Sequence, residues 1–202
     1  MTLYASVARL KDALGVSDQR DDTKVQLAAE TASEMIDDYC GRTFGTVVAT
    51  RVFAPEDEDE LDIGDLAGTA ITIATKSNVL GTSYDLTWSA SEYLLQPLNG
   101  LRAGVEWPYT TVVAIAPRFF LEYEDIPTVQ ITGTWGWPSV PARVTMAATL
   151  QAERLFKRFD SPLGVAGFGD MGVMRVSRQL DPDVEQMLTR YRRGEDAVGG
   201  IA

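Results

Sequence analysis

The densest group of side chains that could do chemistry is a run of five carboxylates, Glu56-Asp57-Glu58-Asp59-Glu60, with Asp62 and Asp65 close behind. Carboxylate oxygens are the ligands that Ca²⁺ prefers, so one hypothesis is a calcium-binding loop. The spacing of an EF-hand is not met, because Leu61 and Asp62 stand where an oxygen ligand and the glycine belong. Since adjacent carboxylates repel one another, we expect a solvated loop, and an acidic patch that faces a partner is the alternative.

A second candidate is the glycine-rich segment Gly164-Val165-Ala166-Gly167-Phe168-Gly169, which could cradle a phosphate. It lacks the Gly-Lys-Ser/Thr ending of a phosphate-binding loop, and it follows a predicted helix rather than a strand. Apolar side chains interrupt its glycines at Val165 and Phe168, and flank them at Leu163 and Met171. A flexible loop is the simplest interpretation. Because such side chains are costly to leave in water, the alternative is a mobile loop that becomes ordered on a neighbouring chain.

The chain has no histidine, which is the commonest general base and metal ligand, so it offers no Ser-His-Asp or Cys-His catalytic site. Cys40 is its single cysteine, and without a base to activate the thiol we expect a small core residue. A carboxylate-based sugar hydrolase stays open as an alternative, although no spacing fixes two carboxylates at a defined separation. Its candidate residues are Trp88, Trp107, Trp135, Trp137, Glu106, Glu122 and Glu124.

The composition limits the class of protein. The 202 residues are 45% hydrophobic, enough for a sizeable core, and no window of about 18 uninterrupted apolar residues predicts a membrane span. The net charge is −11, and residues 1–100 alone carry 17 acidic and 7 basic residues, a net of −10. Tight binding to DNA needs a basic face, so this balance argues against it. A protein that lets DNA pass without gripping it remains compatible with these charges.

The elements that must position these residues are of two kinds. Apolar side chains at helical spacing predict helices over 7–14, 22–39, 142–159 and 182–193. Gly15 and Gly41 are expected to end the first two. Short β-branched runs broken by turn residues predict strands over 47–53, 70–75, 84–88, 92–96, 110–116, 129–135 and 173–176. Strands in series with no helix between them favour an antiparallel sheet or a small sandwich.

The predicted fold class is therefore α+β. A helical core, made of two N-terminal helices, a long C-terminal helix and a short last helix, holds an inserted antiparallel β-sheet or sandwich region. The expected domains are an N-terminal helical part of the core at 1–45, a β-rich insertion at 46–135, and a C-terminal helical part at 136–193. The last of these contains a glycine-rich loop at 160–172, and a flexible tail is expected at 194–202.

The joint between the predicted strand 129–135 and the predicted helix 142–159 concentrates residues that restrict the backbone or fill space. Tryptophan at such a joint packs into a core more often than it stacks on a ligand. Proline suits the first turn of the helix that follows. We expect a fixed hinge that orients the insertion on the helical core. Its hinge and packing residues are Gly133, Trp135, Gly136, Trp137, Pro138 and Pro141.

Basic side chains gather in the last two predicted helices. One interpretation is ordinary charge at helix C-termini, where the helix dipole favours it. The other is an interface to an acidic surface, such as the N-terminal half of a second copy. Together with the glycine-rich segment, the candidate interface residues are Arg154, Lys157, Arg158, Leu163, Gly164, Val165, Gly167, Phe168, Gly169, Met171, Arg190, Arg192 and Arg193.

Five stretches, taken together and in this order, carry a family resemblance: VARLKDALGV at 7–16, IDDYCGRTF at 36–44, TGTWGWPSVP at 132–141, LFKRFDSPLG at 155–164 and DPDV at 181–184. They resemble the head–tail connector proteins of tailed bacteriophages, the head-to-tail adaptor family. Residues 46–128 match this family only in being an inserted β region.

The resemblance implies a helical core with a β insertion and a dodecameric ring of copies on the portal protein at the capsid vertex. The next connector or stopper ring would lie below, and double-stranded DNA would pass through the channel without sequence-specific binding. The resemblance further implies a structural virion protein of the head–tail junction, made in the host bacterial cytoplasm. No enzymatic activity, cofactor, metal or membrane partner is implied. A stopper or tail-completion protein of the same junction is the alternative, but these are expected to be mostly β.

Overall fold

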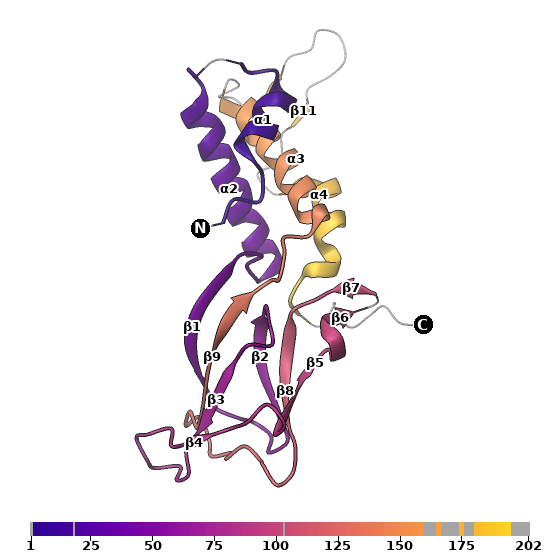
Figure 1. Ribbon diagram of the computed structural model, residues 1–202. Coiled ribbons are helices and arrows are strands. Elements are labelled where there is room, and N and C mark those ends of the chain that lie inside the picture. Colours follow the sequence, from indigo (N-terminus) through magenta and orange to yellow (C-terminus); the bar gives the residue numbers. More distant parts are fainter. Residues whose placement is uncertain are drawn as a thin grey trace. The chain divides into compact units, whose positions relative to one another are not determined.

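The computed structural model describes residues 2–17, 19–102, 104–159, 165–166, 174–175 and 180–194. The chain divides into two compact units (Figure 1). The helical unit comprises Met1–Phe44 and Val140–Ala202, and the β unit comprises Gly45–Ser139. Helices and a largely antiparallel sheet make up the described residues, so the predicted α+β class is confirmed. No helix in these ranges is both long enough and apolar enough to span a membrane.

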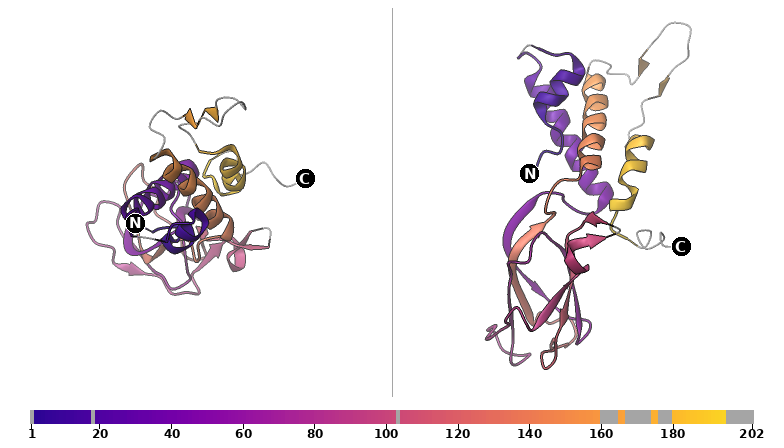
Figure 2. Two further views of the ribbon diagram at one scale, coloured as in Figure 1. Left: turned by 90° about the horizontal axis from the view of Figure 1, so that it is seen from above. Right: turned by 45° about the vertical axis from the view of Figure 1, so that its right-hand side comes forward.

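The helical unit is built around two long helices. Its described helices are α1 (Val7–Leu14), α2 (Asp22–Cys40), α3 (Ala142–Phe159) and α4 (Pro182–Leu188), which continues into the 3₁₀ turn η2 (Thr189–Tyr191). α2 and α3 lie side by side (Figures 1 and 2). Small side chains dominate the buried faces of both, which lets two helices pack closely. These are Ala28, Ala29, Ala32, Ala147, Ala148 and Ala152.

Glycines end the first two helices, as predicted. Gly15 and Gly41 have φ angles of 68° and 62°, in the left-handed region that favours glycine, and their N–H groups donate to carbonyls of the last turn. The fourth helix is shorter than predicted, because helical hydrogen bonding gives way to a 3₁₀ turn after Leu188. At its other end the Asp181 carboxylate caps it by accepting from the Asp183 N–H at 2.7 Å.

The segment before α1 is tied to the C-terminal half of α2 by the buried side chain of Tyr4. Its hydroxyl donates to Asp37 Oδ1 at 2.6 Å and accepts from the Phe44 N–H at 2.8 Å. Its own N–H donates to Ser33 Oγ at 3.1 Å. The Phe44 ring then packs edge-on against Tyr4 and Tyr191, so three chain segments meet there.

The β unit contains a seven-stranded sheet in the order β4-β3-β9-β2-β8-β5, with β1 added to β9, and all of its pairs are antiparallel. The strands are β1 (Thr46–Phe53), β2 (Glu60–Leu66), β3 (Thr72–Thr75), β4 (Leu86–Thr87), β5 (Tyr93–Gln96), β8 (Tyr109–Ala114) and β9 (Val129–Gly136). A separate small ladder joins β6 (Leu101–Arg102) to β7 (Val105–Glu106), after the 3₁₀ turn η1 (Leu98–Gly100). Apolar side chains of these strands and their connections form one core.

β9 is the strand on which the sheet is organised. It pairs with β1 over eight residues, from Thr46 opposite Gly136 to Phe53 opposite Val129. On its other side it pairs with β3 and with the end of β2. The chain therefore enters and leaves the β unit at adjacent positions of one ladder.

Strand β2 was not predicted from the sequence. The solvated-loop prediction is wrong from Glu60 onward, because Glu60–Leu66 pairs with β8 and Leu66 pairs with β9. Its side chains alternate between the two faces, so Leu61 and Ile63 are buried while Glu60 and Asp62 are exposed. A four-residue acidic turn, 56–59, precedes the strand.

Candidate functional site

The joint tryptophans are buried. The Trp135 indole N–H on β9 donates to the Ala49 carbonyl on β1 at 2.8 Å, and the Arg51 guanidinium lies 4.4 Å from the centre of the Trp135 ring. Trp137 meets Trp107 edge to face, with ring centroids 4.7 Å apart. Within the β unit, these contacts hold the end of β9 against β1 and against the segment after β7.

The joint glycines are required by close approach. A Cβ on Gly136 would lie 1.8 Å from the Gly45 carbonyl oxygen, and the φ of Gly136 is +109°. A Cβ on Gly133 would lie 2.9 Å from Ile71 Cγ2 and 3.1 Å from Leu66 Cδ1. Backbone crowds the first position and side chains crowd the second, so Gly136 is the less replaceable of the two.

The two prolines of the joint differ in surroundings. Pro138 is exposed and lines a cavity of about 330 Å³ in the β unit, which ends one residue later at Ser139. The Pro141 carbonyl accepts from the N–H groups of Val144 and Thr145, at 2.9 and 3.1 Å, and so begins the first turn of α3. That the joint orients one unit on the other stays a prediction.

The basic residues of α3 are partly engaged within the helical unit. Arg154 forms an ion pair with Asp181, the buried carboxylate that caps α4. Lys157 and Arg158 lie in the last turn of α3, the first exposed and the second half-buried. Arg154 therefore links α3 to α4 within the helical unit. Its role in an interface stays a prediction.

The second basic group is exposed and lies at the C-terminal end of α2. The Arg193 N–H donates to the Cys40 carbonyl at 2.8 Å. The guanidinium groups of Arg190 and Arg192 each lie over a tyrosine ring, 5.5 and 5.2 Å from the ring centres. Positive charge at this helix end is favoured by the helix dipole.

The structure does not bring the two basic groups together. An 18-residue helix such as α3 is about 27 Å long at 1.5 Å per residue. Lys157 and Arg158 lie at its far end, whereas the group around Arg193 lies beside the end of α2 that faces the start of α3 (Figures 1 and 2). They are two separate positive regions of the helical unit.

Most of the glycine-rich segment lies outside the described residues, namely Leu163, Gly164, Gly167, Phe168, Gly169 and Met171. Val165 belongs to β10 (Val165–Ala166), which pairs antiparallel with β11 (Met174–Arg175). The predicted loop thus includes a two-residue strand, and the strand predicted at 173–176 is present over its middle residues.

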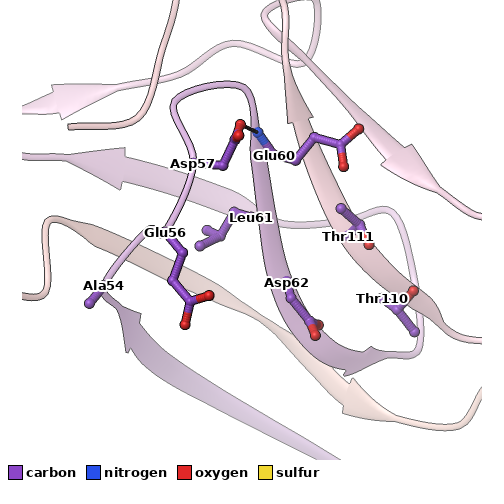
Figure 3. A pocket seen from close by; sticks show the side chains of 8 residues that line it. All are labelled: Ala54, Glu56, Asp57, Glu60, Leu61, Asp62, Thr110 and Thr111. Atoms are coloured by element: carbon purple, nitrogen blue, oxygen red, sulfur yellow. Dashed lines mark hydrogen bonds between the residues drawn. The ribbon is translucent and has the colours of Figure 1, made fainter. Parts of the chain in front are cut away.

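The acidic run borders a hollow of about 410 Å³ in the β unit (Figure 3). Asp57 Oδ1 accepts from the N–H groups of Asp59 and Glu60, at 2.7 and 3.0 Å, and so shapes the turn before β2. The Glu60 carboxylate points away from those of Glu56 and Asp62. In the described part of the chain, no group of three or more acidic or cysteine residues is placed to hold a metal ion.

Two alternatives based on side-chain chemistry lose their geometric basis. All four tryptophans are at most 5% exposed, so none presents a ring face on which a sugar could stack. Glu106 is exposed and accepts from Ser139 Oγ at 3.0 Å, while Glu122 and Glu124 are also exposed. Cys40 is fully buried, and burial raises the pKa of its thiol to about 12, so it is a poor nucleophile.

Lys76 and Arg118, neither of which was a candidate from the sequence, line one cavity of the β unit. A signal was available, because residues 45–139 hold 13 acidic and only four basic residues, a net of −9. Two of those four basic side chains meet at this cavity. The pairing of β3 with β9 places Lys76 at this cavity, and that pairing could not be predicted from the sequence.

No protein-family model and no curated protein matches this chain. Among solved structures, the chain is similar to a chain of the neck of an empty GTA particle computed with C6 symmetry, with a TM-score of 0.56, 13% identity and coverage of 98% of this chain and 93% of that one. It is also similar to a chain of the neck of a native GTA particle computed with C12 symmetry, with a TM-score of 0.52, 14% identity and 99% coverage of both. A chain of the virion of a native gene transfer agent (GTA) particle gives a TM-score of 0.52 and 16% identity, with coverage of 98% and 93%. The chain therefore shares the fold of chains found in the necks and virions of these particles.

Proposed function

We propose that this protein is a structural subunit of a head–tail connector. It forms an adaptor ring between the portal protein and the next connector or stopper ring, and double-stranded DNA passes through that ring. The observation that carries the proposal is the fold likeness, which extends over 98% or more of this chain to chains from GTA necks. The five motifs that resemble the adaptor family lie in the helical unit and at its joint with the β unit.

The charge of the β unit suits passage of DNA. A net of −9 over residues 45–139 repels phosphates, and repulsion opposes the adhesion that would stall a sliding duplex. The exposed carboxylates of the turn before β2 contribute most densely. This makes the protein a conduit rather than a DNA-binding module.

The two basic regions of the helical unit are proposed as contacts with acidic surfaces of neighbouring rings or copies. Arg190, Arg192 and Arg193 are exposed, and the β unit of another copy offers the opposite charge. Charge complementarity of this kind fixes which faces meet and speeds their encounter. The glycine-rich segment is proposed to bind across the same assembly.

The helices favour an adaptor over a stopper. Stopper and tail-completion proteins are expected to be mostly β, whereas the long helices α2 and α3 form the centre of a helical unit here. No enzymatic activity is proposed, and the virion is the proposed location.

Mass spectrometry of purified tailed particles, followed by electron microscopy of their head–tail junctions, tests the proposal. We expect the protein in intact particles and a dodecameric ring of its fold directly below the portal. Absence of the protein from purified particles would refute the connector role. Density for its fold in the next ring down would support a stopper instead.

A further inference from the structure

A small cavity in the β unit combines cationic and apolar groups. It measures about 140 Å³ and lies where the chain leaves β3, close to Trp88 and to the segment after β8. Lys76, Arg118 and Trp88 line it, together with Leu86 and Phe119. Two positive side chains at one small cavity are unexpected in a unit whose net charge is −9.

Lys76 is the unusual member of this cavity. The residue is only 9% exposed. Its backbone N–H donates to the Thr128 carbonyl at 2.9 Å, which extends the β3–β9 ladder by one residue. Within the described ranges, its ammonium makes no hydrogen bond or ion pair, and its one contact is with the Tyr84 ring, 5.5 Å away. The stem of Lys76 is buried while its ammonium reaches solvent at the cavity, so a negative group that enters the cavity can pair with it.

The neighbouring carboxylates are oriented by other donors, and neither forms an ion pair with Lys76 among the described residues. Asp85 accepts from the N–H and the hydroxyl of Ser77, at 2.9 and 2.5 Å, and these bonds lower the pKa of Asp85. Glu92 accepts from Arg118 Nε at 2.7 Å and from the N–H of Ser89 at 2.6 Å. These bonds, led by that from Arg118, lower the pKa of Glu92 to about 2. Both carboxylates are thus ionised and held by donors other than Lys76.

The rest of the cavity is mostly apolar, because the hydroxyls of Thr75 and Ser77 and the guanidinium of Arg118 are hydrogen-bonded to other groups. Trp88 stacks on Phe120 with ring centroids 5.0 Å apart, and its indole N–H donates to Thr75 Oγ1, so it offers the cavity no free donor. At the rim, Leu86 and Phe119 are 38% and 53% exposed. A ligand that fits must therefore bring one negative charge on a short stem and an apolar group for the rim.

We propose that this cavity binds the carboxylate of an acidic side chain on a partner protein, with an apolar neighbour of that residue seated against Phe119. A nucleic-acid phosphate is the less suitable occupant. The Phe120 N–H donates to the Glu58 carbonyl at 2.8 Å, so the acidic turn lies beside the cavity rim. A duplex, with one charge per about 1.7 Å, would be repelled there. A single carboxylate flanked by apolar atoms gains contact with the rim instead.

Peptide titrations of the deuterated, ¹⁵N-labelled full-length protein test the site by amide NMR shifts. The probe is the blocked tripeptide Leu-Glu-Leu, with Leu-Gln-Leu as its uncharged match. We expect saturable shifts confined to 75–77, 86–88 and 117–121 in the low-millimolar range. The glutamine peptide should bind about tenfold more weakly. Equal binding of the two peptides, or no saturable shift with Leu-Glu-Leu, overturns the proposal.

A lysine variant separates a binding role from a structural one. Lys76→Met should abolish binding of Leu-Glu-Leu and should not lower the thermal unfolding midpoint of the free protein, because the ammonium forms no ion pair with the described residues. Lys24→Met, on the exposed surface of α2, should leave binding unchanged. A fall in the midpoint of Lys76→Met would show that the ammonium already has an internal partner, and would overturn the proposal.

Two further probes distinguish the source of the negative charge. Inorganic phosphate and a short DNA duplex are titrated in the same way, and neither is expected to give saturable shifts at Lys76. Stronger shifts with the duplex than with Leu-Glu-Leu overturn a protein partner in favour of nucleic acid. The inference does not depend on the connector role, since the peptide titration needs no portal or ring.

Discussion

At the scale of single residues, the Tyr4 hydroxyl connects groups that are distant in the chain. It bonds Asp37 and Phe44, which lie 33 and 40 residues away. Burial raises the pKa of Asp37, and the hydrogen bond from Tyr4 counteracts part of that rise. The ionised carboxylate therefore depends on the phenol for its stability.

Tyr4→Phe is expected to lower the free energy of unfolding by about 2–3 kcal/mol at neutral pH, since a charged acceptor and a buried N–H both lose a partner. The sign of the pH dependence follows from the raised pKa of Asp37. A raised pKa favours the protonated form of Asp37 in the folded state. The contribution of Asp37 to the free energy of unfolding is therefore greatest in acid and is lost as pH rises through its folded-state pKa. Because the substitution raises that pKa further, its cost should be smaller in acid than at neutral pH.

Urea unfolding followed by circular dichroism at the two pH values measures this difference. Tyr39→Phe is the matched control, because among the described residues the Tyr39 hydroxyl makes only a long bond of 3.4 Å to the Glu185 carbonyl. It should cost less than about 1 kcal/mol. Equal losses for the two variants at neutral pH would contradict the role given to Tyr4.

At the scale of elements, the pairing of β1 with β9 requires glycine at one position, Gly136. Gly136 lies opposite Thr46, with its hydrogen directed at the Gly45 carbonyl. The two strands also share the Trp135 bond to the Ala49 carbonyl and the packing of Phe53 on the Trp135 ring. A substitution of Gly136 is therefore expected to disturb the pairing of β1 with β9 along its length.

Gly136→Ala is expected to cost about 3–5 kcal/mol, because its Cβ meets backbone and its positive φ disfavours alanine. Gly68→Ala is the control, since its Cβ would meet nothing within 4 Å, and it should change stability by about 0.5 kcal/mol or less. Gly133→Ala should fall between them, because the Ile71 side chain can move. Thermal unfolding of the three variants gives the order. A Gly136→Ala protein as stable as Gly68→Ala would disprove the close approach.

The helices were predictable because their signals are local. The apolar stripe and Gly41 place the end of α2 within one residue, and α3 has its predicted bounds. β2 was not predicted, although Leu61 and Ile63 alternate with polar residues as in a strand. This alternation begins inside the acidic run, where the dense carboxylates favoured a solvated loop. The strand order, and with it the cavity at Lys76, depends on contacts between distant segments that one sequence does not reveal.

At the scale of the whole molecule, the β unit is a continuous stretch with its own core. Every member of that core, from Leu61 to Trp135, lies within 45–139. The helical unit is instead made of two stretches separated by the insertion. The two units therefore differ in what they need in order to fold.

A fragment of residues 45–139 is expected to fold alone. Circular dichroism should show β structure, and the buried tryptophans should emit at short wavelength and shift to longer wavelength in urea. A fragment of 54–139, which lacks β1, should be markedly less stable because Trp135 loses its partners on that strand. An unfolded 45–139 fragment would show that the β unit requires the helical unit.

The pairing of Thr46 with Gly136 also has a kinetic consequence. α2 ends at Cys40 and α3 begins at Ala142, so their contact closes a long loop in the unfolded chain. Once β1 and β9 are paired, that loop is effectively reduced from about 100 residues to about ten, which lowers its closure cost by about 2 kcal/mol. The coupling is reciprocal, because packing of α2 on α3 shortens in the same way the loop that β1 and β9 must close, so whichever contact forms first lowers the closure cost of the other.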